Sequence, residues 1–89
     1  MTVTLKDFWA PWCGPCRVQT PIVKELEEEY KKKVKFEEIN VDENIEEAGK
    51  YGVMSIPTLI LEKNGAIVRQ WVGVTSKEDL KEAIDEALG

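Results

Sequence analysis

The chain contains two cysteines, Cys13 and Cys16, within the segment Trp9–Cys16, whose sequence is WAPWCGPC. Hydrophobic residues lead into this segment and a long helical pattern follows it, so the pair is predicted to lie at a strand-to-helix turn. Two thiols three positions apart at such a turn can close a small disulfide ring and open it again. In a cytosolic protein, a Cys-x-x-Cys pair near a βαβ pattern is typical of redox chemistry. The spacing therefore predicts thiol–disulfide exchange.

The same pair has two other conceivable uses. One is a single structural disulfide, although such bonds are rare in cytosolic proteins. The other is metal binding, but zinc normally takes four ligands. Because the sequence has no histidine, carboxylates or a second chain would have to complete a zinc site. We expect no metal and no bound cofactor, and instead a redox-active disulfide between Cys13 and Cys16.

The two thiols are expected to differ in role. Cys13 lies at the start of the predicted helix, where unpaired backbone N–H groups and the helix dipole favour an anion. Because the thiolate is the attacking species in disulfide exchange, we assign Cys13 as the nucleophile. Cys16 lies one turn further in, is expected to be more shielded, and is assigned as the resolving thiol. Gly14 and Pro15 keep the turn compact, and Pro15 occupies a position where an N–H would have no helical partner.

A carboxylate, Asp7, interrupts the hydrophobic run that precedes the motif. Near the end of a buried strand, a carboxylate is costly unless it is paired or protonated. Because the thiols follow so closely, we favour a functional role for Asp7. The alternative is an exposed acid at the strand end, or a helix cap.

The first elements that must position these residues are a strand and a long helix. Residues 2–8 alternate as a strand does, and a helix is expected from the motif to about Lys32. Pro21 lies inside this helix and should kink it. The apolar stripe of the helix is predicted at four-residue spacing, widened by Val23: Val18, Ile22, Leu26 and Tyr30.

A second strand over Val34–Val41 and a short helix over residues 43–51 are expected next. Asp42 is placed to cap that helix. Ile45 and Ala48 are predicted to face inward from it. This pair of elements would complete a strand–helix–strand–helix half of the fold.

A hairpin and a final helix are predicted for the remainder. Asn64-Gly65 is a strong hairpin signal between a strand over residues 58–61 and another over 66–72. Ser76 and Asp79 resemble a capping box that opens the last helix. The buried stripe of that helix is predicted to be Leu80, Ala83, Ile84, Ala87 and Leu88.

These elements follow the order β-α-β-α-β-β-α and fit a single α/β domain over residues 1–89. The alternation of strand and helix argues for a parallel core pair, the hairpin adds an antiparallel portion, and right-handed crossovers place helices on both faces. The net charge of −5 argues against a nucleic-acid partner. No apolar run approaches the ~20 residues that cross a bilayer, and residues 1–7 lack signal-peptide features. We expect a cytoplasmic monomer.

The segment Asp7–Cys16 resembles the active-site segment of the thioredoxin family. Further matches keep the family spacing: Pro21, Asn40-Val41-Asp42, Tyr51-Gly52, Ile56-Pro57-Thr58-Leu59, Asn64-Gly65 and Val72-Gly73. The resemblance covers essentially the whole chain. It implies a thioredoxin-like fold and a dithiol that reduces disulfides in protein substrates. It also implies a thioredoxin reductase as the electron donor and no bound cofactor.

The resemblance also implies roles for residues outside the motif. Asp7 resembles the buried carboxylate that assists proton transfer to and from Cys16. Pro57 resembles the cis-proline beside the active site, which would present the backbone of Ile56 to an extended substrate segment. The implied substrate groove is shallow and apolar, and its residues are Trp12, Ile56, Pro57, Val72 and Gly73.

The sequence departs from the family pattern in two informative ways. It begins at what would be the family's second strand, so a reduced form with a four-stranded mixed sheet is expected, with the strand over Val34–Val41 at an edge. Glu38 stands where thioredoxins commonly carry a lysine near the buried aspartate. A carboxylate there would raise the pKa of Asp7; the alternative is a solvent-facing Glu38.

Three other functions compete with a disulfide reductant. A disulfide oxidase or isomerase is disfavoured because Gly14, Pro15 and Ile56 resemble reducing thioredoxins. A glutaredoxin-like protein suits the size but not the active-site residues. A non-catalytic interaction module is disfavoured because both cysteines, Asp7 and Pro57 are retained.

Overall fold

The two central strands of the sheet are β1 (Val3–Trp9) and β3 (Thr58–Lys63), in a computed structural model that describes residues 1–89. β1 pairs in parallel with β2 (Lys35–Asn40), and β3 pairs in antiparallel with both β1 and β4 (Ala66–Val72). The strand order is β2-β1-β3-β4, so β2 lies at an edge, as predicted. The helices are α1 (Gly14–Glu29), α2 (Ile45–Lys50) and α3 (Lys77–Leu88). The predicted element order and mixed four-stranded sheet are confirmed.

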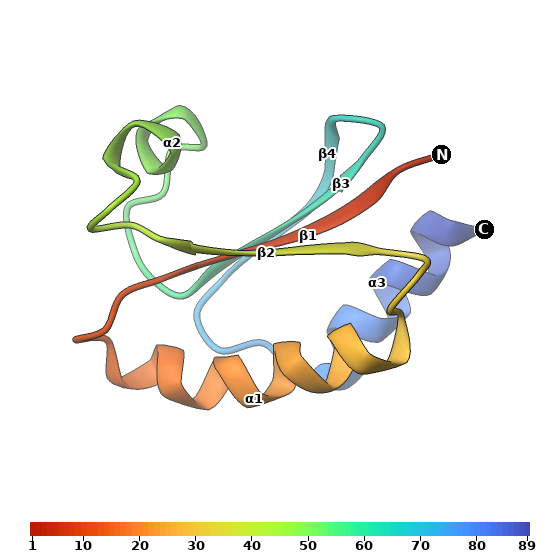
Figure 1. The fold of residues 1–89 in the computed structure, drawn as a ribbon, viewed down its shortest axis with the longest axis horizontal. Coiled ribbons are helices and arrows are strands. Elements are labelled where there is room, and N and C mark those ends of the chain that lie inside the picture. The colour runs from red at the N-terminus through yellow and green to blue at the C-terminus, as the bar shows by residue number, and fades with distance from the viewer.

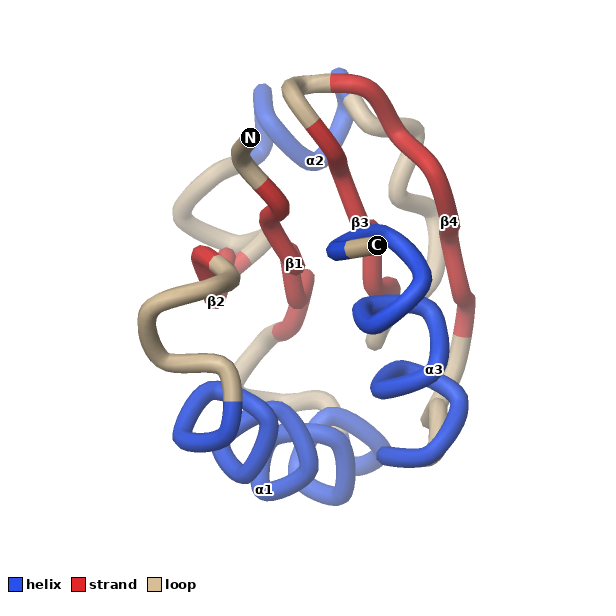
Figure 2. Tube along the Cα trace, turned by 90° about the vertical axis from the view of Figure 1, so that its right-hand side faces the viewer, coloured by secondary structure: helices blue, strands red, loops and turns tan.

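Helices cover both faces of the sheet. α1 and α3 lie together against one face, and α2 lies against the other (Figures 1 and 2). Alternate residues of β1 serve the two faces: Val3 and Leu5 pack with α1 and α3, whereas Phe8 packs with Ala48 of α2. By the same alternation Asp7 lies on the α1 face. None of the helices is long and apolar enough to cross a membrane.

The predicted apolar stripe of α1 is confirmed at Val23, Leu26 and Tyr30, with Ile22 partly buried against the same core, and is wrong at Val18. Val18 is exposed, and the buried residues of the helix are Cys16, Gln19, Val23 and Leu26, with Tyr30 buried just beyond its end. Spacing along a helix defines a stripe but does not say which of two overlapping stripes meets the sheet. Here the polar Gln19 lies on the inner side because the loop before α3 supplies partners for its amide.

The prediction for α2 was wrong in two respects. Asn44 occupies the N-cap position and its side chain forms no capping bond. Asp42 instead accepts a hydrogen bond from the Trp12 indole. Ile45 is 74% exposed, and Ala48 is the only buried residue of the helix. A helix of six residues presents little more than one inward position to the sheet, so apolar packing alone holds α2 weakly.

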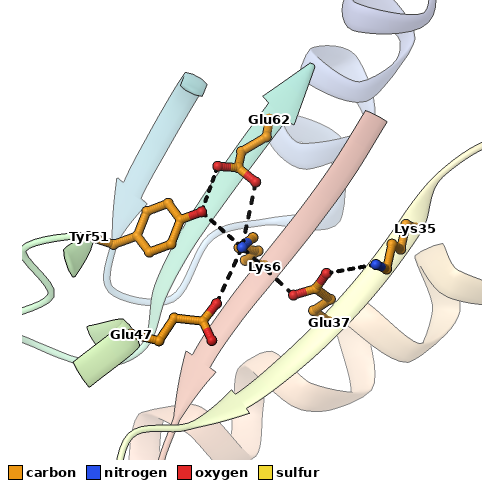
Figure 3. Close-up of polar contacts among 6 residues, drawn as sticks. All are labelled: Lys6, Lys35, Glu37, Glu47, Tyr51 and Glu62. Carbon is orange, nitrogen blue, oxygen red and sulfur yellow. Dashed lines mark hydrogen bonds and ion pairs between the residues drawn. The ribbon is translucent and has the colours of Figure 1, made fainter. Parts of the chain in front are cut away.

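A buried lysine supplies the other attachment of α2. Lys6 points from β1 toward α2, and its Nζ donates to Tyr51 Oη (2.9 Å) and Glu47 Oε2 (3.3 Å) (Figure 3). Its other carboxylate neighbours are Glu62 (3.6 Å) and Glu37 (3.7 Å). Burial alone lowers the pKa of Lys6, but these hydrogen bonds and charges raise it overall. The network joins β1, β2, β3 and α2 through a single ammonium group.

The local signals in the second half of the chain formed as predicted. Asn64 (φ 54°) and Gly65 (φ 84°) turn the β3–β4 hairpin with the positive φ values that a tight hairpin requires. The Ser76 hydroxyl accepts from the Asp79 N–H (3.1 Å) and caps α3. Four stripe residues of α3 join the larger core, Leu80, Ala83, Ile84 and Ala87, and Leu88 packs against it.

Candidate active site

The two cysteines lie at the N-terminus of α1, at one end of the sheet (Figure 1). They are joined by a disulfide, with Cα atoms 5.3 Å apart. Cys13 is the N-cap residue, and its sulfur accepts a hydrogen bond from the Cys16 N–H (3.2 Å). The first turn of a helix has unpaired N–H groups, and here one of them points at the Cys13 sulfur. The same N–H group would stabilise negative charge on the Cys13 sulfur once the disulfide is reduced.

Exposure does not distinguish the two sulfur-bearing residues in this oxidised state. Cys13 is 4% exposed and Cys16 is 2% exposed. The greater shielding expected for Cys16 is thus very small. The difference between the two residues lies instead in their positions, because Cys13 caps the helix and Cys16 lies inside it.

The loop before β3 packs directly against the disulfide. The Ile56–Pro57 peptide bond is cis, the isomer expected from the resemblance. The Cys13 sulfur lies 3.7 Å from the Ile56 carbonyl oxygen. On the other side of the proline, the Gly73 N–H donates to the Pro57 carbonyl (2.8 Å) and extends the β3–β4 pairing by one bond. Gly73 adopts φ 92°, a backbone conformation that favours glycine.

An apolar depression lies beside the disulfide and is formed by Trp12 and the loop before Pro57. Its volume is about 450 Å³, and its lining residues are Trp12, Val41, Val53, Met54, Ser55 and Ile56. Trp12 is 68% exposed. Its indole N–H donates to Asp42 Oδ2 (2.9 Å), which fixes the ring at the rim. Two of the predicted groove residues, Trp12 and Ile56, therefore line this depression.

The other two predicted groove residues lie on the far side of Pro57. Val72 ends β4 and is exposed, and Gly73 bonds the Pro57 carbonyl. They do not line the depression beside Trp12. The structure thus divides the predicted groove into two parts that meet at the cis-proline.

Asp7 is buried on the face of β1 that α1 covers, and its Oδ1 atom has no hydrogen-bond partner. Burial raises the pKa of Asp7 to about 7, and the negative charge of Glu38 adds to this shift. Glu38 is the residue of β2 opposite Asp7 in the parallel pairing, and it is an exposed residue whose side chain is 32% exposed. Its carboxylate pairs with Lys24 of α1 (3.3 Å). Glu38 therefore faces solvent and also lies opposite Asp7, close enough for its charge to raise the pKa of Asp7.

The sequence offered a signal for one important residue that was missed. Gln19 lies three positions after Cys16, in register with Val23, Leu26 and Tyr30, and is fully buried. A polar residue in register with an apolar stripe indicates a buried polar contact, because such a group is costly without partners.

No cluster of three or more His, Cys, Asp or Glu side chains that could hold a metal ion is present.

Comparison with known proteins agrees with this geometry. The thioredoxin family model matches residues 2–86. A thioredoxin of Bacillus subtilis (strain 168) is 54% identical over 86 residues, which cover 97% of this chain and 83% of the relative. A thioredoxin of Alicyclobacillus acidocaldarius is 48% identical over 84 residues (94% and 80%), and one of Listeria monocytogenes is 46% identical over 84 residues (94% and 82%). With a joined cysteine pair at the start of α1 and similarity over nearly its whole length, the chain belongs to the thioredoxin family of thiol–disulfide oxidoreductases.

Proposed function

We propose that this oxidoreductase reduces disulfides of other proteins, with Cys13 as the nucleophile and Cys16 as the resolving thiol. The observation that carries the proposal is the position of Cys13. Its sulfur lies at the helix N-terminus, receives the Cys16 N–H, and contacts the backbone of the cis-proline loop. A substrate held by that backbone would bring its disulfide to Cys13 before Cys16.

The exchange has two balanced steps. The Cys13 thiolate attacks one sulfur of the substrate disulfide, so that a mixed disulfide forms, the substrate S–S bond breaks, and the leaving thiolate takes up a proton. The Cys16 thiol then loses its proton and attacks the Cys13 sulfur. The Cys13–Cys16 disulfide forms, the second substrate thiol is released, and two electrons have passed to the substrate.

Asp7 is proposed to accept the proton that Cys16 loses in the second step. A general base works best when its pKa is close to the working pH, and burial together with Glu38 raises the pKa of Asp7 to about 7. At neutral pH the carboxyl group is therefore present in both forms. It can take a proton during substrate reduction and return it when the disulfide is reduced again.

The substrate segment is proposed to bind across the cis-proline. The backbone of Ile56 would pair with an extended segment as an added strand. Trp12 would contact the substrate on one side of Pro57, and Val72 with Gly73 on the other. Both sides are supported by exposure, since the large apolar side chains of Trp12 and Val72 are 68% and 66% exposed.

We further propose that a thioredoxin reductase returns electrons to the oxidised pair, and that the protein works as a single-domain monomer in the cytoplasm. Protein thiols are kept reduced in that compartment. Gel filtration coupled to light scattering would test the monomer. Turnover with purified bacterial thioredoxin reductase and NADPH would test the electron donor.

The thiol roles are tested by trapping. Reduced Cys16→Ser protein is mixed with a disulfide-containing protein such as insulin, and the adducts are followed by non-reducing mass spectrometry. We expect Cys16→Ser to accumulate a mixed disulfide through Cys13, whereas Cys13→Ser forms none. An adduct only on Cys13→Ser would reverse the assignment. Partner binding by Cys13→Ser without electron transfer would instead favour an interaction module.

A further inference from the structure

The side chain of Gln19 forms a pair of hydrogen bonds with the loop between β4 and α3. It lies in α1 and is 0% exposed. Its Nε2 donates to the Thr75 carbonyl (3.2 Å), and its Oε1 accepts from the Thr75 N–H (2.7 Å). One side-chain amide thus satisfies both backbone polar groups of a single buried residue, as a neighbouring β-strand would.

Thr75 connects this pair to the substrate side of the site. It lies between β4 and α3, and its hydroxyl donates to the Gly73 carbonyl (3.1 Å). Gly73 in turn donates its N–H to the Pro57 carbonyl (2.8 Å). A continuous path of hydrogen bonds therefore runs from α1 to the cis-proline through Gln19, Thr75 and Gly73.

We propose that Gln19 is a positioning residue that sets the 73–75 loop, and with it the Val72–Gly73 side of the groove, at a fixed place relative to the Cys13–Cys16 pair. This inference rests on the proposed function, because the groove matters only if the substrates are proteins. Gln19 forms no hydrogen bond with either sulfur. Its effect on the reaction therefore passes through the loop.

The chemical reason for a glutamine is the need for a donor and an acceptor on one short group. An apolar side chain of similar size would suit the buried surroundings but leave the Thr75 N–H and carbonyl without partners. Buried backbone groups without partners are strongly disfavoured. The loop would then move outward to reach water, and one wall of the groove would lose its fixed position.

The test compares a protein substrate with a small one. Gln19→Met keeps the length and approximate volume of the side chain and removes both hydrogen bonds. The pre-reduced variant is reacted with insulin and, separately, with 2-hydroxyethyl disulfide, which is too small to span the groove. We expect the rate constant with insulin to fall about three- to tenfold. The rate constant with the small disulfide should fall much less, so that the ratio of the two changes.

Val23→Ala is the matched control. Val23 is buried in the same helix, packs in the larger core and takes no part in the hydrogen-bonded path. Its truncation lowers stability through a cavity, but the ratio of the two rate constants should stay at the wild-type value. Amide exchange followed by NMR gives a second readout: exchange at Gly73 and Thr75 should accelerate in Gln19→Met and not in Val23→Ala.

The outcomes separate the inference from the proposed function. A wild-type ratio in Gln19→Met, or an equal fall with both substrates, would overturn the positioning role while leaving protein-disulfide reduction intact. Failure of the wild-type protein to reduce insulin, with the small disulfide still reduced, would overturn the proposed function and the inference with it. If Gln19→Met does not fold, Gln19→Leu and the exchange rates of its loop decide the question.

Discussion

Asp7 carries a full charge at neutral pH in the unfolded chain but only about half of one in the folded protein, because folding raises its pKa from 3.8 to about 7. An acid whose pKa is raised by folding binds more protons in the folded state between those two values. Stability therefore falls as the pH rises from about 4 to about 7, and the loss is complete above that range. The buried carboxylate therefore destabilises the fold at neutral pH, where its proposed proton transfer would take place.

The first prediction follows from this linkage. Asp7→Asn should raise the free energy of unfolding of the oxidised protein at pH 8 by about 2–4 kcal/mol. The gain should disappear below pH 4, where Asp7 is protonated in both states. Denaturant titration of both proteins across this pH range measures the difference. A gain that is equal at pH 4 and pH 8 would show that packing, not ionisation, is responsible.

The second prediction concerns Glu38, which lies opposite Asp7 in the sheet, and Lys24, which pairs with Glu38. Glu38→Gln should lower the pKa of Asp7, but leave it well above 3.8, because burial is the larger cause of the shift. Lys24→Gln removes the cation paired with Glu38 and should move the pKa of Asp7 upward. The carboxyl carbon of Asp7, followed by NMR titration, reports both shifts. Shifts in the same direction in the two variants would contradict the coupling.

At the scale of elements, α2 depends on a charge network more than on apolar contacts. Ala48 is its only buried residue, whereas Lys6 binds Glu47 within it and Tyr51 just after it. Breaking a buried ion pair by removing one partner is costly because the remaining charges are left uncompensated. Since the loop that ends in the cis-proline follows α2, the network also supports one side of the active site.

The third prediction tests this attachment. Lys6→Met should lower the free energy of unfolding by about 2–4 kcal/mol, because Glu37, Glu47 and Glu62 lose their shared cation. Backbone amides of residues 45–53 should exchange faster with solvent. Lys31→Met serves as the control, since Lys31 pairs with Glu28 at the surface and such pairs contribute about 0–1 kcal/mol. Equal losses in the two variants would rule out a special role for the network.

The sequence predicted the elements well where the signal is local. The hairpin at Asn64-Gly65, the cap at Ser76 and the strand over residues 66–72 depend on neighbouring residues only, and all formed. The exposed Val18 and Ile45 were misplaced because long-range contacts decide which helix face turns inward. Local spacing contains no information on that choice.

The residues of the active site divide in the same way, into those that local spacing predicts and those that depend on long-range contacts. Cys13, Cys16 and Pro57 could be found from motif spacing, and the structure brings them together. The register of Gln19 could have indicated a buried polar residue, but its partner and those of Lys6 could not be predicted, because they are distant in sequence. Thr75 lies 56 positions from Gln19, and Tyr51 lies 45 positions from Lys6. Partners so far apart in the sequence can be identified only when the three-dimensional fold is known.

At the scale of the whole molecule, the fourth prediction concerns the reduction potential of the Cys13–Cys16 couple. Membership of the family sets the expectation near the reference value of thioredoxin itself, about −270 mV. Equilibration with dithiothreitol buffers measures the potential. For two electrons, about 30 mV corresponds to ~1.4 kcal/mol. A potential near that of the oxidant DsbA, about −120 mV, would indicate an oxidase instead.

The central place of β1 has a consequence for synthesis. β1 is synthesised before both of its neighbours in the sheet, and one of them is β3, which begins at residue 58. Its other neighbour, β2, pairs only after α1 has crossed over the sheet. The apolar residues Val3, Leu5 and Phe8 thus lack part of their packing until β3 has been synthesised. Of the four strands in this sheet, the one that ends at the redox site waits longest for a neighbour, and it is open to chaperones and to aggregation in the meantime.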